Sequence, residues 1–285
     1  MLEIYEEKAK ILTEALPYIK NYSDEIIVIK CDENLTENKE LTKMVMDDII
    51  LLNTIGIKTI LVHGGKKEIL NMMEKLGKEP QYIGNNLVLD NEAMDIIQMT
   101  LDGKINKYIV NAIESAGGKG LGVSGIDGHL IIAEKIDEKY GNLGKIVEIK
   151  EELLLDILEK GYVPVVSPVG CDDSGNYYFI NPDEVTSSIG SKLKAKSIFI
   201  MMDKMGILKD KNDINSLVAE VNLSGINALK KEGVIEKELE KSVDACVEAI
   251  RQGVEKAFIL DGSISHSLLI EILSDAGIGT MIVGI

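Results

Sequence analysis

The 285-residue sequence predicts an α/β protein of three layers, with a mainly parallel open sheet between helices and two lobes that share this sheet. Short β-branched runs, such as Val163 to Ser167, alternate with segments of helical period along nearly the whole chain. Helices of this length between strands indicate right-handed βαβ crossovers and therefore parallel pairing. We expect an N-terminal helix over residues 1–22, an N-terminal lobe over 23–180 and a C-terminal lobe over 181–285.

Hydrophobic spacing and turn residues place the elements in the first half of the chain. Leu12, Leu16 and Ile19 recur at helical spacing, and Pro17 is expected to kink their helix. The expected helices are residues 4–21, 39–55, a segment from the Gly64-Gly65 pair to about residue 76, and 91–116 as one helix or two abutting ones. The expected strands are residues 25–30, 58–63, 119–123, 129–134 and 144–149.

The same alternation continues in the second half. Asp172 to Gly175 is typical of a turn, and Asn181-Pro182 is typical of a helix start, with a cap residue before a proline. The expected helices are residues 150–160, 182–194, 222–231, 239–252 and 266–274. The expected strands are residues 163–167, 177–180, 198–202, 257–260 and 280–283.

Composition and charge exclude several classes of function. The formal net charge of −16 argues against partners such as nucleic acid or an anionic membrane, which require a basic face. No segment approaches the ~20 apolar residues of a membrane span. Cys31, Cys171 and Cys246 are odd in number and lack metal-ligand spacing, so we expect neither a disulfide framework nor a metal site. These features, with an acidic N-terminal segment in place of a basic signal region, predict a cytoplasmic protein.

The chain carries a single arginine, Arg251, so every other cationic side chain is a lysine. Arginine binds carboxylates and phosphates through two parallel hydrogen bonds, whereas lysine acts as a point charge. The net negative charge still permits a locally positive site for a small anion. We therefore expect any anionic ligand to be bound without an arginine.

Ligands of an open parallel sheet bind beyond the carboxyl ends of its strands. The residues expected there are Lys30, Gly64, Gly65, Lys66, Asn181, Asp183, Asp203 and Gly206. A glycine pair between a strand and a helix permits close approach of an anion to the backbone. Lys30 ends a buried strand, which is an unusual place for an ammonium group. The glycine pair is explained equally well as a tight turn. Local sequence favours helix capping for Asn181 and Asp183, and a turn for Asp203 and Gly206.

Taken in order, these motifs resemble those of acetylglutamate kinases of the amino-acid kinase family, over nearly the whole chain. The stretches that carry the resemblance are Val28 to Lys30, Val62 to Gly65, Gly103 to Lys107, Gly122 to Gly125, Gly161 to Val165, Asn181 with Asp183, Asp203 with Gly206, and Gly277 to Met281. Ala15 to Ile19 resembles the N-terminal helix of hexameric, arginine-regulated members. The resemblance implies acetylglutamate bound in the N-terminal lobe, MgATP in the C-terminal lobe, and a homo-oligomer, either a dimer or a hexamer.

The resemblance also implies functions for single residues. Lys30 matches the first catalytic lysine, and Asp183 matches the aspartate that organises the lysines. Lys241 is adjacent to the position of the second catalytic lysine. Gly64, Gly65 and Asn181 would bind the substrate, and Asp203 and Gly206 would bind the nucleotide.

Six positions depart from the family pattern where the chemistry is expected. Asp32, Glu33 and Lys66 replace glycines, Val88 replaces a substrate-binding arginine, Phe179 an asparagine, and Ser242 the second lysine. An acid at ~5 Å from the γ-phosphate costs about 3 kcal/mol at an effective dielectric of ~20. Losing one donor to the transition state costs roughly 10²–10³ in rate. The set therefore predicts impaired acetylglutamate kinase activity.

Three hypotheses follow. In the first, the protein is a binding, assembly or regulatory paralogue that acts beside an active kinase and needs no cofactor. In the second, it is a working kinase with a rebuilt site, which uses Lys30, Lys66 and Lys241 and takes MgATP and acetylglutamate or another small anionic acid. In the third, it is an effector sensor. Tyr18, Glu271 and Gly277 resemble parts of the family's arginine site, although Ser197 replaces a lysine beside it.

Overall fold

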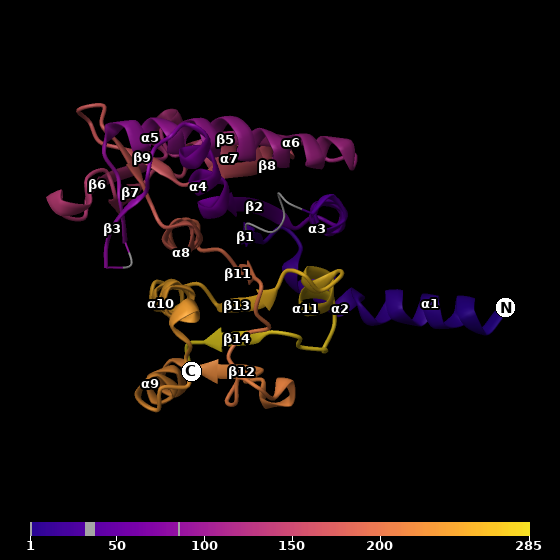
Figure 1. Ribbon diagram of the computed structural model, residues 1–285. Coiled ribbons are helices and arrows are strands. Elements are labelled where there is room, and N and C mark those ends of the chain that lie inside the picture. Colours follow the sequence, from indigo (N-terminus) through magenta and orange to yellow (C-terminus); the bar gives the residue numbers. More distant parts are fainter. Residues whose placement is uncertain (1, 32–37, 85) are drawn as a thin grey trace.

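The computed structural model describes residues 2–31, 38–84 and 86–285, and within this part a central sheet of eight strands runs through the molecule (Figure 1). Its order is β12-β14-β13-β11-β1-β2-β8-β5. The strands are β1 (Ile26–Cys31), β2 (Lys58–His63), β5 (Gly120–Ser124), β8 (Val163–Ser167), β11 (Ser197–Met202), β12 (Glu220–Asn222), β13 (Lys256–Asp261) and β14 (Thr280–Val283). All neighbours pair in parallel except β13 and β14, which are antiparallel. The predicted mainly parallel α/β fold is confirmed.

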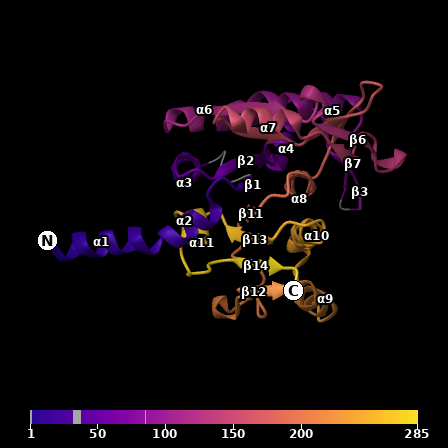
Figure 2. The ribbon, with the colours of Figure 1, turned by 180° about the vertical axis from the view of Figure 1, so that it is seen from behind.

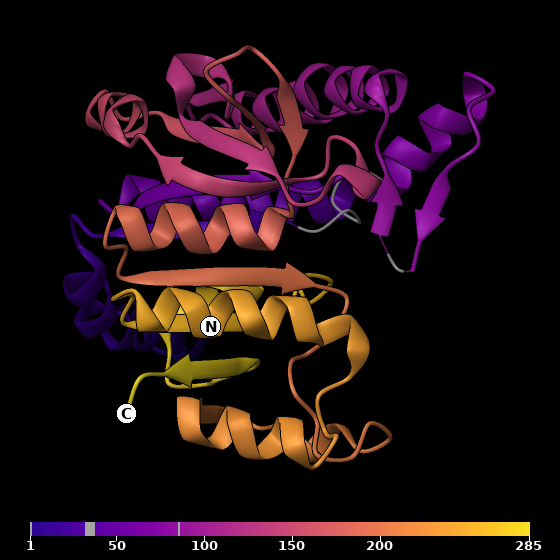
Figure 3. The same ribbon diagram turned by 90° about the vertical axis from the view of Figure 1, so that its left-hand side faces the viewer.

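Helices cover both faces of this sheet, as Figure 3 shows for the face with α8 and α10. The helices are α1 (Leu2–Glu14), α2 (Leu16–Tyr22), α3 (Lys39–Thr54), α4 (Lys66–Lys75), α5 (Asn91–Gln98), α6 (Asn106–Ser115), α7 (Glu152–Glu159), α8 (Pro182–Lys192), α9 (Leu223–Lys231), α10 (Lys237–Arg251) and α11 (Ser267–Leu273). Successive strand residues point to opposite faces, so Val28 joins one hydrophobic cluster with α7 to α10. Ile27 and Ile29 join the other, with α3 to α6 and α11.

The N-terminal segment differs from the expected single helix kinked at Pro17. The chain forms two helices that meet at Ala15, and Pro17 is the second residue of α2. Proline is tolerated in the first turn of a helix because the N–H groups there have no partner within the helix. Helix α1 projects from the body, as Figures 1 and 2 show from opposite sides. Its Ile11 and Leu12 are 59% and 71% exposed.

The long helical segment predicted for residues 91–116 is continuous but not uniform. Between α5 and α6 lies a π-helical stretch, Met99–Ile105, with the wider turn that often marks functional places in helices. The Thr100 hydroxyl donates to the carbonyl of Ile96 at 2.7 Å. The stretch lies against the glycine turn after β2, which brings it close to the site described below.

Several short strands were not predicted. They are the hairpin strands β3 (Gln81–Ile83) and β4 (Asn86–Val88), together with β9 (Val169–Cys171) and β12. Each of these strands has three residues, which is too short for the alternation of apolar and polar side chains to be recognised. Strands β6 (Ile131–Lys135), β7 (Gly144–Ile149) and β10 (Tyr177–Phe179) were expected, and with β9 they form a second sheet of order β10-β9-β6-β7. Short 3₁₀ turns lie at Asp127–His129, Glu138–Tyr140 and Ile214–Ser216.

Two further findings concern the part of the chain that the structure describes. None of its helices has both the length and the apolar character needed to cross a membrane. Cys31, Cys171 and Cys246 are buried, and none of the three takes part in a disulfide within the described residues.

Candidate active site

A cavity of about 1160 Å³ opens beside the carboxyl ends of β1 and β2. The second sheet, α8 and α10 form its other sides. It collects residues that the sequence places far apart. The predicted site residues that line it are Lys30, Gly64, Gly65, Lys66, Phe179, Asn181, Asp183, Lys241 and Ser242. The cavity lies at the edge of the sheet where the rule for parallel strands places ligands, and binding there stays a prediction.

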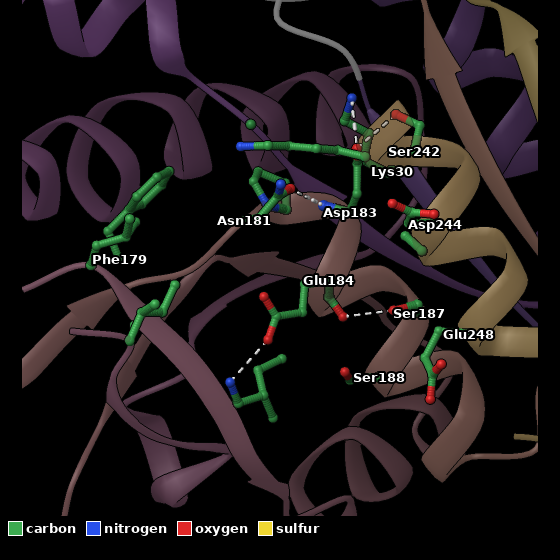
Figure 4. Close-up of a pocket in the computed structure, with 18 of the residues that line it drawn as sticks. Lys30, Phe179, Asn181, Asp183, Glu184, Ser187, Ser188, Ser242, Asp244 and Glu248 are labelled. Atoms are coloured by element: carbon green, nitrogen blue, oxygen red, sulfur yellow. Dashed lines mark hydrogen bonds and ion pairs between the residues drawn. The ribbon is translucent and has the colours of Figure 1, made fainter. Parts of the chain in front are cut away.

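Lys30, Asp183 and Ser242 form a buried polar group on one side of the cavity (Figure 4). The Lys30 Nζ lies 3.4 Å from Asp183 Oδ1, and the two side chains are only 13% and 10% exposed. The Ser242 hydroxyl donates to Asp183 Oδ2 at 2.7 Å. Asp183 is thus contacted by Lys30 and by Ser242. Because the ion pair is buried, solvent and salt screen the attraction between its two charges only weakly.

The local sequence explains how these side chains reach one another. Lys30 is the next-to-last residue of the central strand β1, where it pairs with Val62 of β2 and Ile200 of β11. Asn181 caps α8 by accepting the Asp183 N–H on its side-chain oxygen at 2.9 Å. Helix α8 packs on β1 and α10, so its first turn is brought to the Lys30 ammonium and to Ser242. The two interpretations of Asn181, helix cap and site residue, are therefore compatible.

The glycine turn after β2 is packed tightly against the π-helical stretch. A Cβ on Gly65 would lie 2.4 Å from Ile105 Cδ1 and 2.7 Å from Leu101 Cδ2, so only glycine fits without movement of these side chains. His63, just before the turn, is fully buried, and its Nδ1 bonds to the Gly64 carbonyl at 3.0 Å. Burial lowers the pKa of His63 to about 4, which keeps the imidazole neutral. His63 therefore shapes the turn without adding a charge.

Two further lysines line the cavity. Lys241 is exposed, whereas the adjacent Ser242 is 3% exposed, because one step along a helix turns a side chain by about 100°. Lys66 begins α4 directly after the glycine turn. Asp32 and Glu33, which were expected beside the same phosphate site, lie outside the described residues.

Three predicted site positions lie apart from the lining of the cavity. In β4, Asn86 and Leu87 line it, whereas Val88 pairs with Gln81 in the hairpin. The expectation that Val88 takes the place of a substrate-binding side chain stays a prediction.

Asp203 and Gly206 belong to the loop after β11, outside the set of lining residues. Gly206 has a φ of 136°, and a Cβ there would lie 2.4 Å from the Thr280 hydroxyl, so glycine is needed for packing against β14. The same hydroxyl accepts the Ile207 N–H at 2.8 Å.

Sequence reasoning missed an acidic side of the cavity. Glu184 lines it and accepts the Ile146 N–H from β7 at 3.0 Å, and burial raises the pKa of its carboxyl. Asp244 and Glu248 of α10 line the same cavity (Figure 4). Glu184 belongs to the first turn of α8, where an acid is common for reasons unrelated to a site. Nothing in the local sequence indicates that β7 and α10 lie opposite it.

The residues of the predicted effector site are also placed by the structure. Ser197 shares a hydrogen bond of 3.1 Å with the Tyr22 hydroxyl. Glu271 accepts the Ile278 N–H at 2.9 Å and lies 4.0 Å from the Cβ position of Gly277. Effector binding here stays a prediction.

Comparison with known proteins decides the family. A sequence profile of the amino acid kinase family matches residues 25–261. The chain belongs to this family. It is 43% identical to an acetylglutamate kinase of Brachyspira hyodysenteriae over 277 residues, with 96% of each chain covered. It is 40% identical to that of Clostridium kluyveri over 280 residues, with 98% of this chain and 99% of that one covered.

The fold agrees with this family assignment. The structure resembles an N-acetylglutamate synthase from Neisseria gonorrhoeae, complexed with coenzyme A and N-acetyl-glutamate, with a TM-score of 0.86 at 22% identity. The match covers 97% of this chain and spans 63% of the synthase chain. The resemblance to acetylglutamate kinases is thus confirmed by sequence, and the fold agrees with the amino acid kinase family.

Proposed function

We propose that this protein is an ATP-dependent kinase that transfers the γ-phosphoryl group of MgATP to a carboxylate of N-acetylglutamate or a closely related small acid. The observation that carries the proposal is the buried Lys30–Asp183 ion pair at the edge of a cavity that a glycine turn also lines. The Ser242 hydroxyl donates a hydrogen bond to the Asp183 carboxylate of this pair. Relatives at 40–43% identity over nearly the whole chain are acetylglutamate kinases, which supports activity rather than its loss.

Each residue has a proposed task. A carboxylate oxygen of the acceptor forms the new bond to the γ-phosphorus, and the bond from that phosphorus to the β–γ bridging oxygen breaks, releasing ADP. The acceptor is already ionised near neutral pH, so no proton has to be removed. Lys30 stabilises the charge on the transferring phosphoryl group, and Asp183 orients Lys30. Lys241 and Lys66 add positive charge at the same cavity.

The remaining tasks concern substrate placement. We assign the acceptor to the glycine turn and Asn181, on the side of residues 23–180, and the nucleotide to the part from residue 181 onward, including the loop with Asp203 and Gly206. The described residues contain no group of three or more His, Cys, Asp or Glu side chains placed to hold a metal ion. Magnesium enters as part of the MgATP substrate.

Trapping the acyl phosphate with hydroxylamine tests the proposal. The wild-type protein with MgATP and N-acetylglutamate is expected to give a hydroxamate, and Lys30→Met is expected to lower the rate by roughly 10²-fold or more, because one transition-state donor is lost. Lys58→Met is the matched control, since Lys58 belongs to a surface pair at the start of β2. A Lys30→Met rate equal to that of the control would refute the assignment of Lys30.

A second candidate is a non-catalytic paralogue that binds ligands or assembles with an active kinase. It is favoured by one observation: Ser242, at the position of the family's second lysine, is buried and neutral, and it bonds to Asp183. This candidate predicts no hydroxamate from the pure protein and a changed rate of an active acetylglutamate kinase upon mixing. If mixing leaves that rate unchanged, this candidate is rejected.

We also propose that the protein forms a homo-oligomer. The projecting helix α1 and its exposed Ile11 and Leu12 support this, because apolar side chains on an isolated helix gain from a partner. Light scattering on the full chain and on the variant Ile11→Lys/Leu12→Lys measures the mass. A monomeric full chain would contradict the proposal.

A further inference from the structure

Asn106 is a buried polar residue that contacts the histidine before the glycine turn. It begins α6 directly after the π-helical stretch, and it is 1% exposed. Helix α6 packs on β5 and β8 (Figure 1), and β8 lies between β5 and β2 in the sheet. A polar side chain at this depth needs partners for its hydrogen-bonding groups, because an unpaired one is costly to bury.

The amide of Asn106 finds these partners on three neighbouring strands. Its Nδ2 donates to the Val165 carbonyl of β8 at 2.8 Å, and it lies 3.4 Å from the Val123 carbonyl of β5 and 3.4 Å from His63 Nε2 of β2. Because an amide nitrogen carries two hydrogens, Val165 takes one and the two longer contacts share the other. The Asn106 Oδ1 accepts from Lys107 Nζ at 3.1 Å.

The partners determine which way the amide points. Backbone carbonyls can only accept and the Lys107 ammonium can only donate, so the nitrogen faces the strands and the oxygen faces Lys107. Turning the amide over would place its oxygen against two carbonyl oxygens. A Cβ on Gly122 would overlap Asn106 Oδ1, so the glycine in β5 leaves the space that this orientation needs. Asn106 is therefore a donor toward His63.

The proton on His63 follows from the same reasoning. Burial lowers the pKa of its imidazole to about 4, so the ring is neutral, with one nitrogen that donates and one that accepts. Nδ1 lies 3.0 Å from the Gly64 carbonyl, which can only accept. Nε2 faces Asn106 Nδ2, which can only donate. Both neighbours require the same tautomer, with the proton on Nδ1.

This proton sets the orientation of the peptide between Gly64 and Gly65. In the other tautomer the Nδ1 lone pair would face the Gly64 carbonyl oxygen, and their repulsion would turn the peptide away. The described residues contain no cis peptide bond, so the Gly65 N–H points opposite to the Gly64 carbonyl, away from the buried ring. Both glycines line the cavity, and His63 lies outside its lining.

We propose that Asn106 is a positioning residue for the phosphoryl transfer. Its amide holds His63 in the Nδ1–H tautomer, and this tautomer fixes the Gly64–Gly65 peptide with the Gly65 N–H toward the acceptor carboxylate. Asn106 itself touches neither substrate and acts only through the imidazole. The effect on the rate rests on the proposed kinase function, whereas the tautomer does not depend on it.

Nitrogen NMR of the full chain, labelled with ¹⁵N at histidine, tests the tautomer directly. The chain has three histidines, and the signals of His63 are those that disappear in His63→Gln. At neutral pH we expect a protonated Nδ1 and a bare Nε2 in the long-range proton–nitrogen spectrum of the wild type. A protonated Nε2, or averaged signals of two tautomers, would overturn the inference. This measurement requires no variant of Asn106 to fold.

Asn106→Ala tests the link from the tautomer to the rate. Without the donor to Nε2, the ratio of the Nδ1–H to the Nε2–H form is expected to fall by about tenfold, as for the loss of one buried hydrogen bond. The kcat of hydroxamate formation is expected to fall by about tenfold or more, because a small displacement of a positioning group is costly. The KM for MgATP is expected to stay unchanged.

Ile113→Val is the matched control. Ile113 is a fully buried residue of the same helix, and its substitution loses one methyl group without removing a hydrogen bond to the imidazole. We expect this control to keep the wild-type tautomer and kcat. The inference fails if Asn106→Ala also keeps both, or if Ile113→Val changes both to the same extent.

A cycle with His63→Leu separates positioning from a purely structural role. If Asn106 acts through His63, then Asn106→Ala has little further effect on kcat once the imidazole is gone, and the double variant has the rate of His63→Leu. Effects that multiply would show that Asn106 acts by another route and would overturn the inference.

Failure of the inference and failure of the kinase proposal give different results. Hydroxamate formed by a wild-type protein with a protonated Nε2 keeps the kinase and rejects the inference. The expected tautomer, shifted in Asn106→Ala but with no hydroxamate from the wild type, keeps the link between Asn106 and His63 and rejects the kinase.

Discussion

The ion pair between Lys30 and Asp183 leads to a quantitative prediction about stability. At 3.4 Å, and with an effective dielectric of ~20, the attraction between the two charges is about 5 kcal/mol. Desolvation of both groups offsets much of this in the folded state. Removing one partner is different, because the other charge stays buried and unpaired, at a typical cost of 3–5 kcal/mol. Lys30→Met is therefore expected to lower the free energy of unfolding by about 3 kcal/mol.

A double-mutant cycle in urea unfolding tests this magnitude. Asp183→Asn removes the charge but keeps an oxygen for the Ser242 hydroxyl, so the double variant is expected to regain much of the loss. The coupling between the two substitutions is expected to be about 3 kcal/mol. Lys58→Met is the control, because Lys58 and Asp24 are 42% and 89% exposed at 3.9 Å, and such pairs contribute about 0–1 kcal/mol. Additivity of the two site substitutions within about 0.5 kcal/mol would refute the reasoning.

Three further predictions concern the turn after β2 and the start of α3. The folded state holds the pKa of His63 near 4, below its ordinary 6.5, so the unfolded chain binds the proton more tightly and stability falls as pH drops from 6.5 to 4, by about 3 kcal/mol in all. His63→Gln should lack this part of the pH dependence of urea unfolding, and an identical profile would contradict the assignment. Gly65→Ala should lower the unfolding free energy by about 1–3 kcal/mol, since the methyl group displaces Ile105 and Leu101, and an unchanged midpoint would exclude this crowding. Asn38→Ala removes the cap that accepts two N–H groups of α3 and should cost about 1 kcal/mol in thermal unfolding; no change would mean that the cap is dispensable.

Much of the fold is encoded in local patterns. The strands Lys58–His63, Val163–Ser167 and Thr280–Val283 have the predicted bounds because β-branched runs between turns are short-range signals. The antiparallel direction of β14 was not predictable in this way. Strand direction depends on which neighbour a strand finds, and neither periodicity nor turn residues record this.

The candidate site was predictable where a rule connects sequence to position. Lys30 and Asp183 each follow or end a strand of the predicted sheet, so their meeting at one edge was expected. The approach of Leu143 to Phe179 beside the cavity was not expected, because the two residues are brought together by a backbone bridge at the second sheet. No local sequence pattern indicates this pairing. In β4, Asn86 and Leu87 line the cavity, and the expectation that Val88 replaces a substrate-binding side chain stays a prediction.

The measurement that tests the central claim most directly is a single-turnover transfer from γ-labelled ATP. Excess protein is mixed with MgATP and N-acetylglutamate, and the labelled acyl phosphate is separated from ATP and free phosphate. The account predicts label in the acyl phosphate for the wild type and for Lys58→Met, and loss of this product for Lys30→Met. Label that stays in ATP with all three proteins, although ATP is bound, would contradict the kinase and favour the non-catalytic paralogue.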